Sequence, residues 1–156
     1  MSVVPPPRDE ANWLLAQLSD PAYARVRAIS EHVDLHHKDV LSEPGEPIEF
    51  AHFPETACLS IITMMNDGHA VEVGTVGPEG LTGLSFIHGI NSEPTRNIVQ
   101  IRGSGKRIER AAFVAELKEN REFADLVGRY AQAWTEQIAR SGSCNAVHSI
   151  DERCAR

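Results

Sequence analysis

The sequence predicts an α+β protein: a small antiparallel β jelly roll, preceded by short helices and followed by one long helix. Three observations predict this fold class. The middle of the chain alternates apolar and polar residues in short runs between glycine- and proline-rich turns. Both ends of the chain instead repeat apolar residues every three or four positions, the period of an amphipathic helix. The 156 residues suffice for one such domain and not for two.

The amino-terminal segment divides into a lead and a helical part. Residues 1–8 include the proline run Pro5-Pro6-Pro7, which cannot continue a helix, so we expect a flexible lead there. From 12 to 30, apolar residues recur at helical spacing, with a break at Ser19-Asp20-Pro21. This pattern predicts one or two short helices, and we expect the folded domain to begin near residue 9.

The first strands are predicted from alternation and turn signals. Residues 48–53 alternate as a half-exposed strand, and Pro54 ends it. The clearest hairpin joins the apolar, β-branched run 58–65 to the alternating run 70–76 through the turn Asn66-Asp67-Gly68. Short strands joined by such turns are typical of a small barrel or jelly roll.

Two more strands and two helices complete the chain. We expect strands at 97–101 and 106–109, joined by Gly103-Ser104-Gly105. A short helix is predicted at 111–118, and Asn120 can cap a longer one that continues to about Ser141. At 1.5 Å per residue, the longer helix is on the order of 30 Å long, which exceeds what covering one small barrel requires. One face of this helix carries Phe123, Val127, Tyr130, Trp134 and Ile138. This face fits two interpretations: it covers the barrel, or it forms the seam of a two-helix dimer.

Several stretches of the chain carry a family resemblance through their order and spacing. They are 35–41 followed by Glu43-Pro44-Gly45-Glu46-Pro47, then His52-Phe53-Pro54, Asn66-Asp67-Gly68, and the run 72–84 that contains Gly77-Pro78-Glu79-Gly80-Leu81-Thr82-Gly83. Together they cover most of residues 12–110, and they resemble the sensor half of the Crp/Fnr transcription regulators. The resemblance implies a cyclic-nucleotide-binding-like sensor domain over 9–118, a dimerisation helix over 119–143, and over 144–156 the start of a hinge toward a DNA-binding domain.

The resemblance favours the dimer interpretation of the long helix. It implies a homodimer whose interface consists of Phe123, Val127, Tyr130, Trp134 and Ile138, and a small-molecule effector for the sensor domain. The winged helix-turn-helix of the family has no counterpart in these residues, and the net charge of −7 disfavours binding to a polyanion. We therefore predict the sensing and dimerisation module of a Crp/Fnr-like regulator, without specific DNA binding of its own. A truncated regulator that pairs with a full-length homologue is an alternative.

The resemblance also marks a candidate ligand site. In family members that bind a cyclic nucleotide, backbone amides after a glycine-rich turn hold the phosphate, a glutamate holds the ribose, and an arginine pairs with the phosphate. The matching residues are Gly83, Leu84, Ser85, Arg96 and Asn97. Leu84 stands in place of the glutamate, and the lost hydrogen bond costs about 1 to 3 kcal/mol. We therefore expect no tight binding of a cyclic nucleotide and no resident cofactor, although Ser85 offers a hydroxyl as a substitute partner.

Other chemistries find weaker support in the sequence. A cupin-type metalloenzyme is the alternative from another class, but it needs two histidines one residue apart, and His36 and His37 are adjacent and point to opposite faces of a strand. Cys144, His148 and Cys154 lack a fourth metal ligand. No Ser-His-Asp, Gly-x-Ser-x-Gly or P-loop pattern occurs. We predict a protein that is not an enzyme and binds no metal.

The compartment is predicted from what the sequence lacks. No apolar run approaches the roughly 18 residues that span a bilayer, and the first residues do not form a signal peptide. The three cysteines are too few and too scattered for a disulfide scaffold. We therefore expect a cytoplasmic protein with reduced thiols and no membrane partner.

Overall fold

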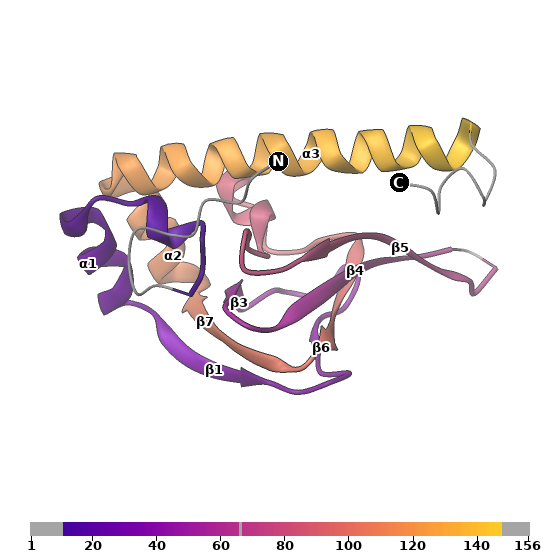
Figure 1. Cartoon of the computed structure of the whole chain (residues 1–156), viewed down its shortest axis with the longest axis horizontal. Helices are drawn as coiled ribbons and strands as arrows, with labels where there is room; N and C mark the ends of the chain where they lie inside the picture. Colours follow the sequence, from indigo (N-terminus) through magenta and orange to yellow (C-terminus); the bar gives the residue numbers. More distant parts are fainter. Residues whose placement is uncertain (1–10, 66, 148–156) are drawn as a thin grey trace.

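Two antiparallel sheets form the body of the molecule (Figure 1). The computed structural model describes residues 11–65 and 67–147. The lead expected at 1–8 lies outside the described residues, as does the part of the expected junction from 148 to 156. One sheet has the order β1-β7-β3, with β1 at Glu31–Leu35, β3 at Phe50–Pro54 and β7 at Gly103–Glu109. The other has the order β2-β6-β4-β5, with β2 at Val40–Ser42, β4 at Cys58–Met64, β5 at Ala70–Val76 and β6 at Thr95–Ile101. The predicted α+β jelly roll is confirmed.

The hairpin of β4 and β5 has the predicted form. The two strands pair from Leu59 opposite Val76 to Met64 opposite Ala70, with one register shift after Ile61. The turn between them includes Gly68, whose φ of 87° lies in the left-handed region that glycine tolerates. The alternating pattern and the turn residues were therefore sufficient to predict this element.

The segment 97–109 differs from its prediction. Gly103 and Gly105 belong to β7 rather than to a turn, and β6 and β7 lie in different sheets, so they do not form a hairpin. A Cβ atom on Gly103 would lie 2.5 Å from the backbone nitrogen of Ala57, and one on Gly105 would lie 2.8 Å from the carbonyl oxygen of Phe53. These glycines are needed because another part of the backbone passes close to β7, a role that a Gly-Ser-Gly pattern does not distinguish from a turn.

Strand β3 also differs, because both of its faces are buried. Ala51 and Phe53 have no exposed surface, and His52 between them is only 6% exposed. The prediction of a half-exposed strand at 48–53 is therefore wrong. The turn that contains Thr82 lies along the free edge of β3, where the His52 N–H donates to the Thr82 hydroxyl and the His52 carbonyl accepts from the Thr82 backbone.

The helices gather at one end and along one side of the barrel. They are the short 3-10 helices η1 at Leu15–Gln17 and η2 at Leu84–His88, and the α-helices α1 at Asp20–Ala28, α2 at Arg110–Glu119 and α3 at Arg121–Val147. Figure 1 shows α1 and α2 at one end and α3 running from them over the strands β4 and β5. Four fully or almost fully buried aromatic rings join these elements at the centre of the main core, namely Phe53, Phe86, Phe113 and Phe123.

Helix α3 covers the barrel with the face that was predicted to form a dimer seam. Phe123 and Val127 are fully buried in the core of their own chain, so the predicted interface is wrong at these two positions. Tyr130 and Trp134 also lie against the barrel: a Cβ on Gly80 would be 2.0 Å from the Tyr130 hydroxyl, and one on Gly74 would be 2.6 Å from the Trp134 ring. Helical periodicity identifies an apolar face but does not say what covers it.

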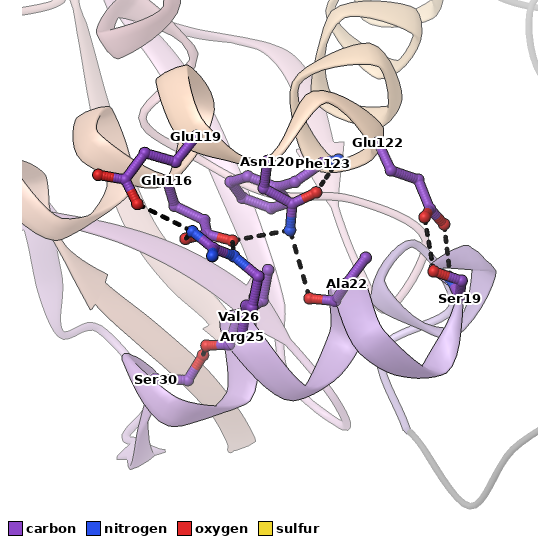
Figure 2. Close-up of polar contacts among 10 residues, drawn as sticks. All are labelled: Ser19, Ala22, Arg25, Val26, Ser30, Glu116, Glu119, Asn120, Glu122 and Phe123. Atoms are coloured by element: carbon purple, nitrogen blue, oxygen red, sulfur yellow. Dashed lines mark hydrogen bonds and ion pairs between the residues drawn. The ribbon is translucent and has the colours of Figure 1, made fainter.

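A network of polar contacts fixes α1 to the bend between α2 and α3 (Figure 2). Asn120 lies at its centre: its Oδ1 accepts a hydrogen bond from the Phe123 backbone at 3.1 Å, which confirms the predicted cap, and its Nδ2 donates to Glu116 at 2.7 Å. Arg25 donates to both oxygens of Glu116 at 2.9 and 3.0 Å. Burial alone would raise the pKa of Glu116, but the hydrogen bonds from Arg25 and Asn120 outweigh it and lower that pKa. Glu122 of α3 also accepts two hydrogen bonds from Ser19.

Candidate functional site

A pocket of about 260 Å³ lies between the four-stranded sheet and α3. Its apolar wall comes mainly from β4, β5 and α3. Its polar residues come from the turn before η2, from η2, from the loop before β6, from β6 and from α3. The residues that line it are Ile61, Val73, Val76, Leu81, Thr82, Gly83, Leu84, Ser85, His88, Glu93, Pro94, Thr95, Asn97, Ala131, Trp134, Thr135 and Ile138. The volume is slightly below the range of about 300–1,000 Å³ that is common for drug-sized ligands, so the pocket suits a small molecule.

The structure brings four of the five predicted ligand-site residues together at this pocket. Gly83, Leu84, Ser85 and Asn97 all line it, although they come from two separate segments of the chain. Gly83 has a φ of 82°, and a Cβ there would lie 3.2 Å from the Cα of Ala51. A side chain at this position would meet both a strained backbone and a crowded neighbour, so glycine is required for the turn that leads into η2.

Arg96 is the predicted residue that the structure does not bring to the pocket. Its Nε donates a hydrogen bond to a carboxylate oxygen of Glu43 at 2.8 Å, on the other face of the sheet from Asn97. The side chains of a strand alternate between its two faces, so Asn97 faces inward and its neighbour Arg96 cannot. The arginine expected to pair with a phosphate is thus engaged elsewhere.

Glu93 is a pocket residue that sequence reasoning missed. One of its carboxylate oxygens accepts a hydrogen bond from the Ser85 backbone at 3.3 Å, and the other accepts one from Asn97 Nδ2 at 3.4 Å. The carboxylate therefore bridges the two segments that carry the predicted site. Glu93 lies in an irregular loop next to Pro94, and no periodic pattern places a loop carboxylate inside a pocket.

Two polar atoms at the pocket remain without a partner inside the described chain. They are the Ser85 hydroxyl oxygen and Asn97 Oδ1, and both are buried. Asn97 is only 2% exposed, and its other amide atom is bonded to Glu93, so the orientation of the amide is fixed by that carboxylate. Buried polar atoms are nearly always hydrogen-bonded in native proteins. Both atoms belong to residues that line the polar end of the pocket.

The charge of the pocket is negative. Among the described residues that line it, none is Lys or Arg, and Glu93 is the carboxylate. His88 is the other ionisable side chain in the lining, and it lies on the exposed side of the opening. An anion that entered the pocket would thus meet a like charge without a compensating cation.

The helix side of the pocket is formed by the part of α3 that follows Tyr130. The rings of Tyr130 and Trp134 stack with centroids 6.5 Å apart, and Trp134 lines the pocket together with Thr135 and Ile138. Burial raises the pKa of Tyr130 above its usual range. Tyr130 fixes α3 to the turn at Gly80, and the pocket opens directly beyond this anchor.

The described residues contain neither a membrane-crossing helix nor a metal-binding cluster. None of their helices has the length and hydropathy needed to cross a bilayer. Nowhere in 11–65 or 67–147 do three His, Cys, Asp or Glu side chains gather closely enough to hold a metal ion. The metalloenzyme alternative therefore has no candidate ligand set in this part of the chain, and of the Cys144, His148 and Cys154 set, the last two residues lie outside it.

Comparisons with known proteins identify the fold. No protein-family model matches the sequence, and no curated protein does. Among solved structures, the c-di-GMP-responsive global regulator CLP of Xanthomonas campestris is similar with a TM-score of 0.74 and 15% identity, over 88% of this chain and 70% of that chain. A cyclic nucleotide-binding domain from Methylobacillus flagellatus has a TM-score of 0.66 and 11% identity, over 83% and 72% of the two chains. The sensor domain of the transcriptional regulator DNR from Pseudomonas aeruginosa has 0.62 and 15%, over 88% and 89%. The chain has the cyclic-nucleotide-binding-like fold of these proteins.

Proposed function

We propose that this chain is the effector-sensing and dimerisation module of a Crp/Fnr-like transcription regulator. The observation that carries the proposal is the position of the pocket, which is walled on one side by the barrel and on the other by Ala131, Trp134, Thr135 and Ile138 of α3. A ligand there touches the barrel and the helix together. If the ligand binds one position of α3 better than another, it shifts the helix toward that position. The neighbours include a regulator's sensor domain, which supports a sensing role rather than an enzymatic one.

The sensing role is tested by filling the pocket from the helix side. Ala131→Leu adds three carbon atoms at a residue that lines the pocket, whereas Ala133→Leu adds the same atoms on the exposed side of α3. A panel of small molecules is screened for compounds that raise the melting temperature, since a ligand at 100 times its Kd stabilises the folded state by about 2.7 kcal/mol. We expect the active compounds to bind A131L at least about tenfold more weakly than the wild type or A133L. Equal binding to A131L, or no active compound at all, contradicts the proposal.

The dimer is proposed to form through a different face of α3 from the one first predicted. The flank next to the pocket carries small side chains, among them Gly128, Thr135 and Ala139, all exposed. Outside its own helix backbone and its two neighbours, Gly128 has no described atom within 4 Å of where a Cβ would lie, so no packing contact inside the chain requires a glycine here. A glycine inside a helix costs about 1 kcal/mol relative to Ala, which a close approach by a second helix would offset. The partner we propose is a second copy of this chain.

Light scattering tests this interface. The wild type should have twice the 17.2 kDa mass of one chain at micromolar concentration. Gly128→Arg places a long charged side chain on the proposed interface without a clash inside the chain, and it should shift the mass to that of the monomer. Ala133→Arg makes the same change in charge on the other exposed flank and should remain dimeric. A monomeric wild type, or equal dimerisation of the two variants, is incompatible with this interface.

The proposed module has no specific DNA contact of its own. Its net charge is −7, and none of the helices among the described residues forms a helix-turn-helix. Neutralisation of phosphates by Lys and Arg supplies most non-specific affinity for DNA, and an acidic module lacks that contribution. We propose that it acts in the cytoplasm by transmitting ligand occupancy through α3.

A further inference from the structure

The carboxylate of Glu93 occupies the hydrogen-bond donors that an anionic ligand would need. The Ser85 backbone and the Asn97 side chain both donate to it, at 3.3 and 3.4 Å. A phosphate at this point would have to displace Glu93 and would then lie beside its charge, with no Lys or Arg in the lining of the described pocket to compensate. The polar end of the pocket therefore suits a positively charged group.

Two further polar atoms at this end can accept hydrogen bonds. Asn97 Oδ1 and the Ser85 hydroxyl are buried without a partner, and each belongs to a residue that already bonds the Glu93 carboxylate. An ammonium group carries three N–H donors and no acceptor. It would pair with the Glu93 carboxylate, which compensates the desolvation of its charge, and its remaining N–H groups are donors of the kind that these two oxygens lack.

The other end of the pocket is apolar. Ile61, Val76, Leu81 and Ile138 contribute aliphatic side chains to the wall, and Trp134 contributes an aromatic ring. Such a wall removes hydrocarbon from water and stabilises a ligand by about 25 cal/mol per Å² of buried apolar surface. The ring of a Trp also attracts a nearby cation.

We propose that this pocket binds a small primary amine, with its ammonium group between Glu93, Asn97 and Ser85 and its hydrocarbon body against α3. The inference rests on the proposed sensing function and names the chemical class of the effector. The amine contacts the loop before β6 at one end and α3 at the other, so it would couple the two. A cyclic nucleotide has the wrong charge for this polar end.

The test compares probes of one shape and three charges by isothermal titration at pH 7. The probes are 2-phenylethylamine as the cation, 2-phenylethanol as the neutral molecule and phenylacetate as the anion, with cyclic AMP as a fourth. We expect the wild type to bind the amine at least about tenfold more tightly than the alcohol, since a charge-assisted hydrogen bond is roughly twice as strong as a neutral one. Phenylacetate and cyclic AMP should show no binding.

Two variants separate the role of Glu93 from a general effect of charge. Glu93→Gln keeps the shape of the side chain but removes its charge and replaces one acceptor oxygen by an NH2 donor, so it should weaken amine binding at least about tenfold and remove the preference over the alcohol. Glu46→Gln makes the same change in net charge at an exposed loop residue and should bind the amine like the wild type. A thermal melt of both variants checks that they fold.

The outcomes distinguish the two proposals. Three results would each overturn the amine inference: equal affinity for the amine and the alcohol, unchanged amine binding by E93Q, or binding of cyclic AMP. If A131L blocks the binding that is then observed, the sensing function stands. No binding by any probe or panel compound overturns both.

Discussion

Replacing Phe113 by Ala is expected to lower the free energy of unfolding by about 3 to 5 kcal/mol, the usual cost of removing a buried aromatic ring. The ring is fully buried, 5.4 Å from the Phe123 ring and 5.7 Å from the Phe86 ring, in edge-to-face geometry with both. It lies on α2 and holds together η2, α2 and α3. The loss of the ring thus leaves a cavity where three elements meet, and urea unfolding followed by circular dichroism measures its cost.

The matched control deletes the same atoms at a more exposed position. Phe50 is partly exposed on β3, with the Arg107 guanidinium 4.3 Å from its ring centre. Phe50→Ala should cost clearly less than Phe113→Ala, because less apolar surface returns to water and no enclosed cavity forms. A similar loss in the free energy of unfolding for the two variants would show that the aromatic cluster is not the centre of the core.

The stability of the protein is expected to fall as the pH decreases from about 6.5 to 4, and His52 should cause about 3 kcal/mol of that loss. Burial and, to a smaller extent, the nearby positive charge of Arg107 together lower the pKa of His52 to about 4. In this pH range the unfolded chain binds a proton at His52 and the folded chain does not. The contribution of neutral His52 is therefore fully present above pH 6.5 and is lost as the pH falls toward 4.

His52→Gln removes the titrating group and isolates this effect. Its unfolding free energy should change between pH 7.5 and 4.5 by about 2 to 3 kcal/mol less than that of the wild type. The lowered pKa of Glu116 also makes the folded state less stable at low pH. This contribution is the same in both proteins, so it cancels in the difference between them. His36→Gln, at an exposed histidine, should behave like the wild type. If H52Q and the wild type lose equal stability in acid, His52 is not held neutral by burial.

The elements that local patterns determine could be predicted from the sequence. The β4–β5 hairpin follows from alternation and its turn, and the Asn120 cap follows from a side chain that bonds a backbone group three residues away. Both features are decided within a few residues of the chain. The turn at Gly83 was instead marked by the family resemblance, and its positive φ gives the physical reason for a glycine there.

The features that remained hidden depend on parts of the chain that are distant in sequence. Phe123 and Val127 lie on a helix face that either the barrel or a second chain could cover, and the sequence pattern is the same in both cases. Arg96 and Asn97 are neighbours, and which of them faces the pocket depends on the register of β6. The position of Glu93 depends on the path of a loop that bonds β6 and η2.

Helix α3 is held along its first half and meets the pocket with its second half. Hydrogen bonds at Asn120 join its first turn to α1 and α2, and Tyr130 packs against the turn at Gly80. The pocket contacts the helix beyond Tyr130, near Thr135. At 1.5 Å per residue, Thr135 lies about 8 Å along the helix from Tyr130, and residue 147 lies about 26 Å from it. If a ligand tilted the helix about Tyr130, the last described residue would move more than three times as far as the residue at the pocket.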